Sequence, residues 1–247
     1  LLLRTPEAGG DDAFTTSLVG IQPSGSRPPL YLVHGVGGGM FWGYANLARH
    51  LGLEQPVHAF KSRGLDGLPE WPTIEEMARR YVADLRAFQP HGPYVLGGYC
   101  FGGNVAYEMA CQLRANGEDA LVILINSSPP HSDYESARFR WSAPWMMRFC
   151  RNLGFWLVSF LLRWEPWERR DFIRWKFRRL RKKLTGWFRP RKADPMEEGV
   201  DEMVDLSTFD ADKRRVWESH VRALIEHHPK PYEGRVVVFR SPVHLFL

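Results

Sequence analysis

The segment "PYVLGGYCFGGNVAYEMACQL" (93–113) constrains the fold of this chain more than any other stretch. A strand-like apolar run at 93–98 and a helical pattern at 104–117 are separated by the short sequence "YCFGG". Such a sharp turn brings the strand and the helix together, so the residues flanking its centre must be small. Glycines meet this need at Gly98, Gly102 and Gly103. The spacing G-x-C-x-G therefore predicts a strained turn that presents Cys100 as a nucleophile at the end of a buried strand.

A second glycine-rich turn, "VHGVGGG" (33–39), follows an earlier strand-like run. At that place a backbone N–H near Val36 can stabilise an oxyanion together with the N–H of Phe101, the residue after Cys100. His34 is expected to support this loop. The N-terminus of the helix after Cys100 is expected to lower the pKa of the thiol. A plain glycine-rich turn and a phosphate loop are the alternatives for 33–39, and both rank below the oxyanion loop. No Gly-Lys-Ser/Thr follows, and G-x-G-x-x-G is not matched.

Strand and helix patterns alternate through much of the chain, which predicts an α/β fold with a mostly parallel sheet flanked by helices. Thr73 and Glu76 form a capping box that predicts where one helix begins. We expect strands at 30–34, 56–60, 93–98, 120–126 and 235–239, and helices at 45–51, 73–88, 104–117 and 211–228. The polar, Gly- and Pro-containing residues 1–28 are interpreted as an interdomain linker, and 29–247 as one domain with a helical lid insertion at about 131–192.

Cysteine and charge patterns narrow the function classes. The three cysteines are an odd number and lack paired spacing, which argues against a disulfide framework and for a reducing, cytoplasmic setting. The sequence contains no cluster of Cys and His with the spacing of a metal site, so no bound metal is expected. The net charge of +5 conceals a segment, 163–192, that carries +10, while the remainder carries −5. A solvated helix face is the simplest interpretation of this segment. It could also dock an acidic carrier protein through Arg174, Arg178 and Arg181, or contact an anionic membrane surface; nucleic acid binding is not expected.

Long stretches of this sequence resemble the thioesterase domains of nonribosomal peptide and polyketide synthetases, which have the α/β-hydrolase fold. The resemblance is carried by "SLVGIQPSGSRPPLYLVHGVGGGMFWGYANLARHLG", "SRGLDG", "IEEMARRYVADLRAFQPHGPYVLGGYCFGGNVAYEMACQL" and "PYEGRVVVFR". It implies an enzyme that releases an acyl or peptidyl chain from the phosphopantetheine of an upstream carrier protein domain, with no bound cofactor. A Cys hydrolase of dienelactone hydrolase type and an inactive acyl-binding or carrier-docking module are the alternatives.

Two positions depart from the pattern of that family. Cys100 replaces serine, and Asn126 stands where the family usually has an aspartate that orients the catalytic histidine. Cys-His-Asn is a working combination elsewhere, because a thiol depends less on a charged orienter. We therefore predict Asn126 as the orienter, with Asp133 ranked below it.

The resemblance places the catalytic histidine beyond Leu247, later than His244, so the sequence as given is expected to be inactive by itself. A thiol nucleophile would form an acyl-enzyme thioester. That intermediate is expected to favour capture by an amine or hydroxyl over hydrolysis, compared with an oxyester.

Overall fold

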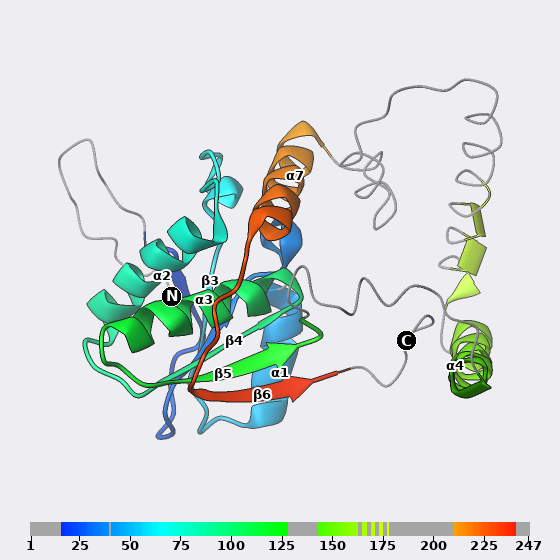
Figure 1. The fold of residues 1–247 in the computed structure, drawn as a ribbon, viewed down its shortest axis with the longest axis horizontal. Coiled ribbons are helices and arrows are strands. Elements are labelled where there is room, and N and C mark those ends of the chain that lie inside the picture. The colour runs from blue at the N-terminus through cyan, green and yellow to red at the C-terminus, as the bar shows by residue number, and fades with distance from the viewer. Residues whose placement is uncertain are drawn as a thin grey trace.

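The computed structural model describes residues 16–39, 41–127, 143–162 and 210–240, together with residues 165, 166, 169, 170, 173, 174 and 177. Its centre is a six-stranded sheet with the order β1-β3-β2-β4-β5-β6 (Figure 1). The strands are β1 (Leu18–Gln22), β2 (Leu30–Val33), β3 (Val57–Phe60), β4 (Tyr94–Tyr99), β5 (Ala120–Ile125) and β6 (Arg235–Phe239). All neighbouring pairs are parallel except β1–β3. The prediction of an α/β fold with a mostly parallel sheet is confirmed.

Strand β1 falls inside the range 1–28 that the sequence analysis assigned to a linker. It pairs antiparallel with β3, and the Lys61 N–H donates to the Ser17 carbonyl at 2.8 Å. The linker prediction is therefore wrong for residues 18–22. Backbone pairing with β3 holds this strand on the sheet, and Leu18 and Ile21 pack partly buried against the two core clusters.

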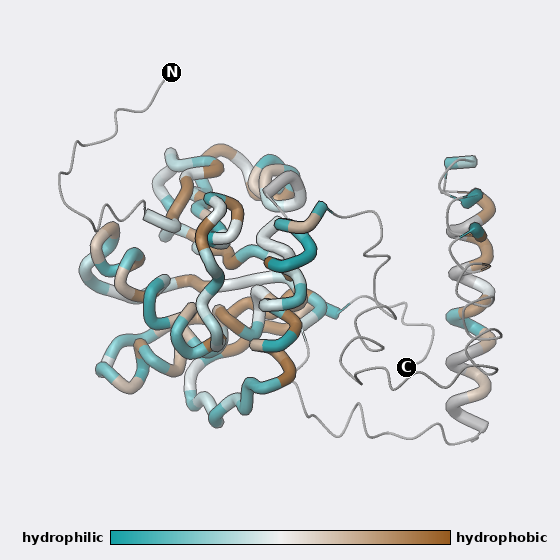
Figure 2. The backbone as a smooth tube through the Cα atoms, turned by 90° about the horizontal axis from the view of Figure 1, so that it is seen from above, coloured by the Kyte–Doolittle hydropathy of each residue, from teal (hydrophilic) through white to brown (hydrophobic). Residues whose placement is uncertain are grey.

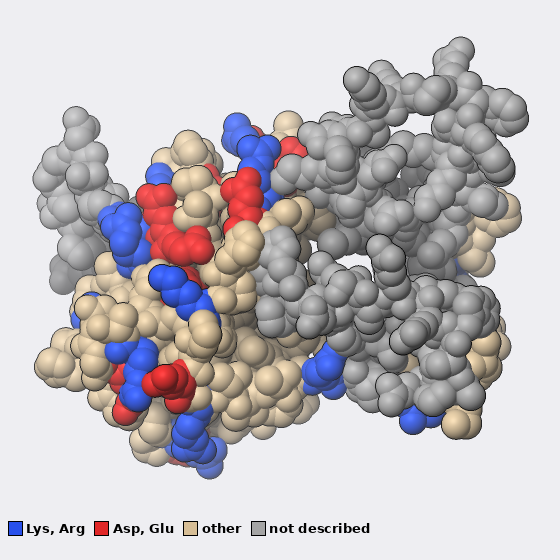
Figure 3. All heavy atoms as spheres, in the orientation of Figure 1, with Lys and Arg blue, Asp and Glu red and all other residues tan. Residues whose placement is uncertain are grey.

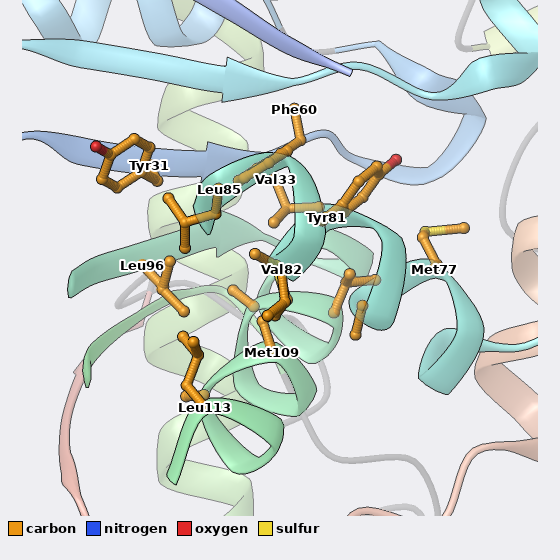
Figure 4. Close-up of a cluster of buried hydrophobic side chains, with 14 of the residues drawn as sticks. Tyr31, Val33, Phe60, Met77, Tyr81, Val82, Leu85, Leu96, Met109 and Leu113 are labelled. Carbon is orange, nitrogen blue, oxygen red and sulfur yellow. The ribbon is translucent and has the colours of Figure 1, made fainter. Parts of the chain in front are cut away.

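Helices cover both faces of the sheet and bury alternate residues of β2. Tyr31 and Val33 pack with α2 (Ile74–Phe88) and α3 (Phe101–Ala115), as the close-up in Figure 4 shows. Leu30 and Leu32 face the opposite side, where they cluster with side chains of α1 (Phe41–Leu51). This period-two alternation, buried on both faces, is the pattern of an inner parallel strand. Strands β2 and β4 are the two middle strands of the sheet.

Local sequence signals determine where helices α2 and α3 begin. The Thr73 hydroxyl accepts the Glu76 N–H at 3.1 Å, so the predicted cap is confirmed. Helix α3 begins at Phe101, earlier than the predicted start at 104, because Gly102 and Gly103 are themselves helical. The helix therefore begins directly at Cys100.

The chain returns to the sheet through α7 (Ala211–Glu226) and β6, while α4 (Ala143–Leu162) lies apart from the sheet in Figures 1 and 2. Most of the range 131–192 lies outside the described residues, so its role as a lid stays a prediction. Within the described ranges, no helix combines the length and apolarity needed to cross a bilayer.

Candidate active site

Cys100 occupies a strained turn between β4 and α3. Its backbone has φ 53° and ψ −117°, a conformation that L-residues rarely adopt. The turn is held on both sides, because the Cys100 N–H donates to the Ile125 carbonyl at 3.0 Å and the Gly103 N–H donates to the Cys100 carbonyl at 3.1 Å. The backbone around the thiol is thus fixed by the neighbouring strand and by the first turn of the helix.

The three flanking glycines are required by space. A Cβ added at Gly98 would lie 2.3 Å from the Gly102 carbonyl carbon, and one added at Gly102 would lie 2.3 Å from the Val33 carbonyl oxygen. A Cβ at Gly103 would overlap the Ser127 hydroxyl. All three distances are much shorter than real Cβ atoms show to their neighbours. The structure therefore has the close approach of strand and helix that the sequence predicts.

Two opposing effects act on the pKa of the Cys100 thiol. Burial raises the pKa of Cys100 above its usual value, and the hydrogen bond from the Phe101 N–H offsets this only in part. The helix N-terminus does lower this pKa, through the Phe101 N–H, as predicted from the sequence, but removal of the thiolate from water outweighs that contribution. At neutral pH the thiol carries its proton, so a base must remove that proton as the thiol attacks.

The predicted oxyanion donors both begin helical turns. Val36 is the first residue of the 3₁₀ turn η1 (Val36–Gly38), and Phe101 is the first residue of α3. The N–H groups of a first turn have no acceptor within their own helix, and such groups are candidates for binding an anion. Because β2 and β4 are parallel neighbours, with Val33 paired to Gly98, both turns leave the same edge of the sheet. Their role as an oxyanion hole stays a prediction.

His34 lies in the interior beneath this loop. Its Nδ1 is 2.8 Å from the Gly35 carbonyl oxygen and its Nε2 is 2.8 Å from the Tyr81 hydroxyl. Burial, and then the neighbouring His220, lower the pKa of His34 to about 3. A neutral imidazole in this setting donates its Nδ1–H to Gly35 and accepts at Nε2. These contacts favour the predicted supporting role.

The low pKa of His34 predicts acid destabilisation. The unfolded chain binds a proton at this residue near pH 6.5, whereas the folded protein does so only near pH 3, so the free energy of unfolding should fall as pH drops through that window. The slope contributed by one proton is about 1.4 kcal/mol per pH unit. Urea unfolding of the wild type and of His34→Gln between pH 6.5 and 4 measures it. Equal slopes in the two proteins would contradict this assignment.

Tyr44 of α1 is a site residue that sequence reasoning missed. Its hydroxyl donates to the Val33 carbonyl at 2.6 Å and accepts the Tyr99 N–H at 3.1 Å. Burial raises its pKa to about 12, so the hydroxyl keeps its proton. One side chain thus ties together the ends of β2 and β4, from which both predicted oxyanion turns leave. No sequence motif marks this tyrosine, because the two strands it joins are far apart in the chain.

Asn126 follows β5 directly and lies beside the Cys100 turn. Tyr99 and Ile125 are paired across β4 and β5, and the Asn126 N–H donates to the Phe239 carbonyl of β6 at 2.8 Å. Its backbone is left-handed, with φ 49°, a conformation that asparagine tolerates better than most residues. The structure therefore places Asn126 at the same sheet edge as Cys100, and its role as orienter stays a prediction.

Of the remaining residues predicted to take part in catalysis or carrier docking, the structure describes only some. Arg174 is exposed, while Arg178, Arg181, Asp133 and His244 lie outside the described residues. Over the part of the chain that is described, no histidine is among the causes that shift the pKa of Cys100, and no cluster of His, Cys, Asp and Glu could hold a metal. Acidic and basic side chains are interspersed on the face seen in Figure 3.

Sequence comparisons identify relatives of this chain. A model of the thioesterase domain family matches residues 28–156. Malpibaldin synthetase of Mortierella alpina is 43% identical over 122 residues, which are 49% of this chain and 2% of that protein. The dimodular nonribosomal peptide synthase of Bacillus subtilis (strain 168) is 37% identical over 127 residues, which are 51% of this chain and 5% of that protein. The chain thus corresponds to a small part of these curated relatives.

Solved structures show the same fold. The NocB thioesterase domain, in a covalent complex with a fluorophosphonate nocardicin G analogue, is 24% identical with a TM-score of 0.56, covering 90% of this chain and 76% of that one. The four-domain nonribosomal peptide synthetase AB3403, bound to AMP and glycine, is 26% identical with a TM-score of 0.55, covering 92% of this chain and 16% of that one. The α/β-hydrolase fold predicted from the sequence is confirmed.

Proposed function

Because this chain belongs to the thioesterase domain family, we propose that it releases an acyl or peptidyl chain from the phosphopantetheine arm of a carrier protein, with Cys100 as the nucleophile. The observation that carries this proposal is the backbone of Cys100, at φ 53° and ψ −117°, between a buried strand and a helix N-terminus. Backbone strain of this kind at a turn between a strand and a helix is characteristic of a nucleophile elbow.

The reaction would proceed in two balanced steps. The Cys100 sulfur gives up its proton to a histidine base and attacks the thioester carbonyl, whose oxygen becomes an oxyanion held by the N–H groups of Val36 and Phe101. The bond to the pantetheine sulfur then breaks, and that sulfur leaves with the proton. Water, an amine or a hydroxyl attacks the new acyl-Cys thioester in the second step and regenerates the thiol.

Asn126 would fix the orientation of the base. Its amide oxygen can accept one imidazole N–H, which leaves the other ring nitrogen free to take the thiol proton. The raised pKa of Cys100 makes this base essential, because the thiol does not ionise by itself at neutral pH. An orienter without charge suits a nucleophile whose proton is more acidic than that of a serine hydroxyl.

The carrier protein is proposed as a partner in the same polypeptide. Support comes from the relatives, which are multidomain nonribosomal peptide synthetases of which this chain matches only a small part. Arg174, Arg178 and Arg181 are proposed to contact the acidic carrier. Reversing their charges should weaken carrier binding in a salt-dependent way.

The proposed function is tested by looking for a covalent acyl adduct on Cys100. The full-length protein is incubated with an acyl-pantetheine thioester, and intact mass followed by peptide mapping locates the acyl group. We expect one adduct, on Cys100, with Cys111 and Cys150 unmodified as internal controls. Bound substrate without any adduct would instead identify an acyl-binding module.

A further inference from the structure

His220 of α7 is fully buried and contacts the loop that carries a predicted oxyanion donor. The Gly37 N–H donates to its Nδ1 at 3.0 Å across a separation of 183 residues. Gly37 has φ 79° inside the turn that begins at Val36. A hydrogen bond to this amide therefore fixes a peptide group of the turn at a residue whose conformation glycine adopts more easily than other residues.

The second ring nitrogen of His220 faces a buried carboxylate. Its Nε2 is 3.4 Å from Oε2 of Glu70, and the two side chains are 0% and 2% exposed. Glu70 is itself anchored, because its Oε1 accepts the Gly64 N–H at 2.6 Å and the Ser62 hydroxyl. Burial raises the pKa of Glu70, but the contacts with His220, Ser62 and Gly64 outweigh burial and leave that pKa below its usual value.

These two contacts select one tautomer of the ring. A nitrogen that accepts an N–H carries no proton, so the proton of neutral His220 is on Nε2, toward the Glu70 carboxylate. A carboxylate behind an imidazole fixes both its tautomer and its orientation. Glu70 thereby keeps Nδ1 available as an acceptor for Gly37.

Aromatic stacking sets the plane of the ring. The His220 ring stacks on Phe101, with centroids 4.7 Å apart, and on His34, with centroids 5.0 Å apart. Phe101 carries the second predicted oxyanion donor on its own backbone. On the same helix, Trp217 lies against the loop, since a Cβ at Gly37 would be 3.0 Å from its Cδ1. Helix α7 therefore contacts both halves of the predicted oxyanion hole.

We propose that His220, held by Glu70, is a positioning residue that pre-organises the oxyanion loop through the Gly37 N–H. The proposal rests on the proposed function. His220 does not act as the base of the reaction, because it is fully buried and both its ring nitrogens face protein groups in the interior. Removing one oxyanion donor typically costs 10²- to 10³-fold in rate, so loosening the loop that carries one should cost about 10- to 100-fold.

Two variants of similar size separate the contacts of the ring. An asparagine at position 220 can place its amide oxygen where Nδ1 lies and accept the Gly37 N–H, but it does not reach Glu70. A glutamine reaches toward Glu70 but leaves the Gly37 N–H without its acceptor. For His220→Asn we expect acylation of Cys100 by acyl-pantetheine within about 3-fold of wild type, and for His220→Gln a loss of about 10- to 100-fold.

Alkylation of Cys100 is the matched control, because iodoacetamide reacts without forming an oxyanion. Its rate should agree within about 2-fold among the three proteins, whereas a purely structural defect would change both reactions. If His220→Gln does not fold, Glu70→Gln replaces it. Its amide would donate to Nε2 and move the ring proton to Nδ1, which would repel the Gly37 N–H and slow acylation in the same way.

Amide hydrogen exchange at Gly37 tests the inference without any chemistry. Exchange should be at least about 10-fold faster in His220→Gln than in wild type, and close to wild type in His220→Asn. An unchanged ratio of acylation to alkylation in His220→Gln, or unchanged Gly37 exchange, would overturn the proposal. If wild type formed no acyl adduct, the proposed function would fail, and Gly37 exchange would still decide the role of His220.

Discussion

Cys100→Ala is expected to abolish the release of an acyl chain from acyl-pantetheine, with a loss of about 10³-fold or more. The reason is that the covalent intermediate has no other sulfur in the strained turn, and removal of a nucleophile commonly costs this much or more. Steady-state release of free pantetheine, followed with a thiol reagent, measures the loss. Cys111→Ala and Cys150→Ala are matched controls, because neither residue lies in the turn between β4 and α3, and both should keep at least half of the activity.

Cys100→Ser adds information on the outcome of the reaction. The serine variant would form an oxyester, which is a poorer acyl donor than a thioester, so the ratio of amine capture to hydrolysis should fall. Product analysis with a fixed concentration of an added amine gives this ratio. Equal ratios for cysteine and serine, or higher turnover with serine, would show that the thiol has no special part in the release step.

Gly102→Ala is expected to lower the free energy of unfolding by about 3 kcal/mol or more. Its Cβ would lie 2.3 Å from the Val33 carbonyl oxygen and 2.5 Å from that of His34, and overpacking against rigid backbone forces strand and helix apart. Within a helix, replacing glycine with alanine normally stabilises by about 1 kcal/mol, so the expected sign is opposite to that of intrinsic propensity.

Gly39→Ala is the matched control for this prediction. Gly39 lies in the other glycine-rich turn, has φ −82° and has no atom within 4 Å of an added Cβ. The free energy of unfolding of the Gly39→Ala variant should differ from that of wild type by less than about 1 kcal/mol. Urea denaturation of the three proteins measures both effects, and comparable stabilities for Gly102→Ala and Gly39→Ala would contradict the packing described at the turn.

Several features of the fold could be read from the sequence because they are local. The strand of 93–98 and the helix after it followed from periodicity, and the cap at Thr73 followed from the identity of two nearby residues. The glycines around Cys100 also predicted a close approach of strand and helix, since each glycine reports on space within a few residues of itself.

Other features depended on contacts between distant segments and were missed or misjudged. Strand β1 gives no strong local signal and is defined by its pairing with β3. The net rise of the Cys100 pKa could not be predicted, because burial depends on everything packed around the thiol, whereas the helix N-terminus, which lowers this pKa, was visible in the sequence. The contact of His220 with Gly37 could not be predicted either, because the two residues are 183 positions apart in the sequence.

The sequence alone determined that a cysteine lies in a sharp strand-to-helix turn of an α/β domain, because strand period, helix period and glycine positions are short-range properties of the chain. Only the tertiary structure decided how buried that cysteine is, and which side chains hold the loop opposite it. The burial of Cys100 and the hydrogen bonds of Tyr44 and His220 depend on the packing of β2, β4 and α7 against one another. These elements are far apart in the sequence, so no short stretch of it determines those contacts.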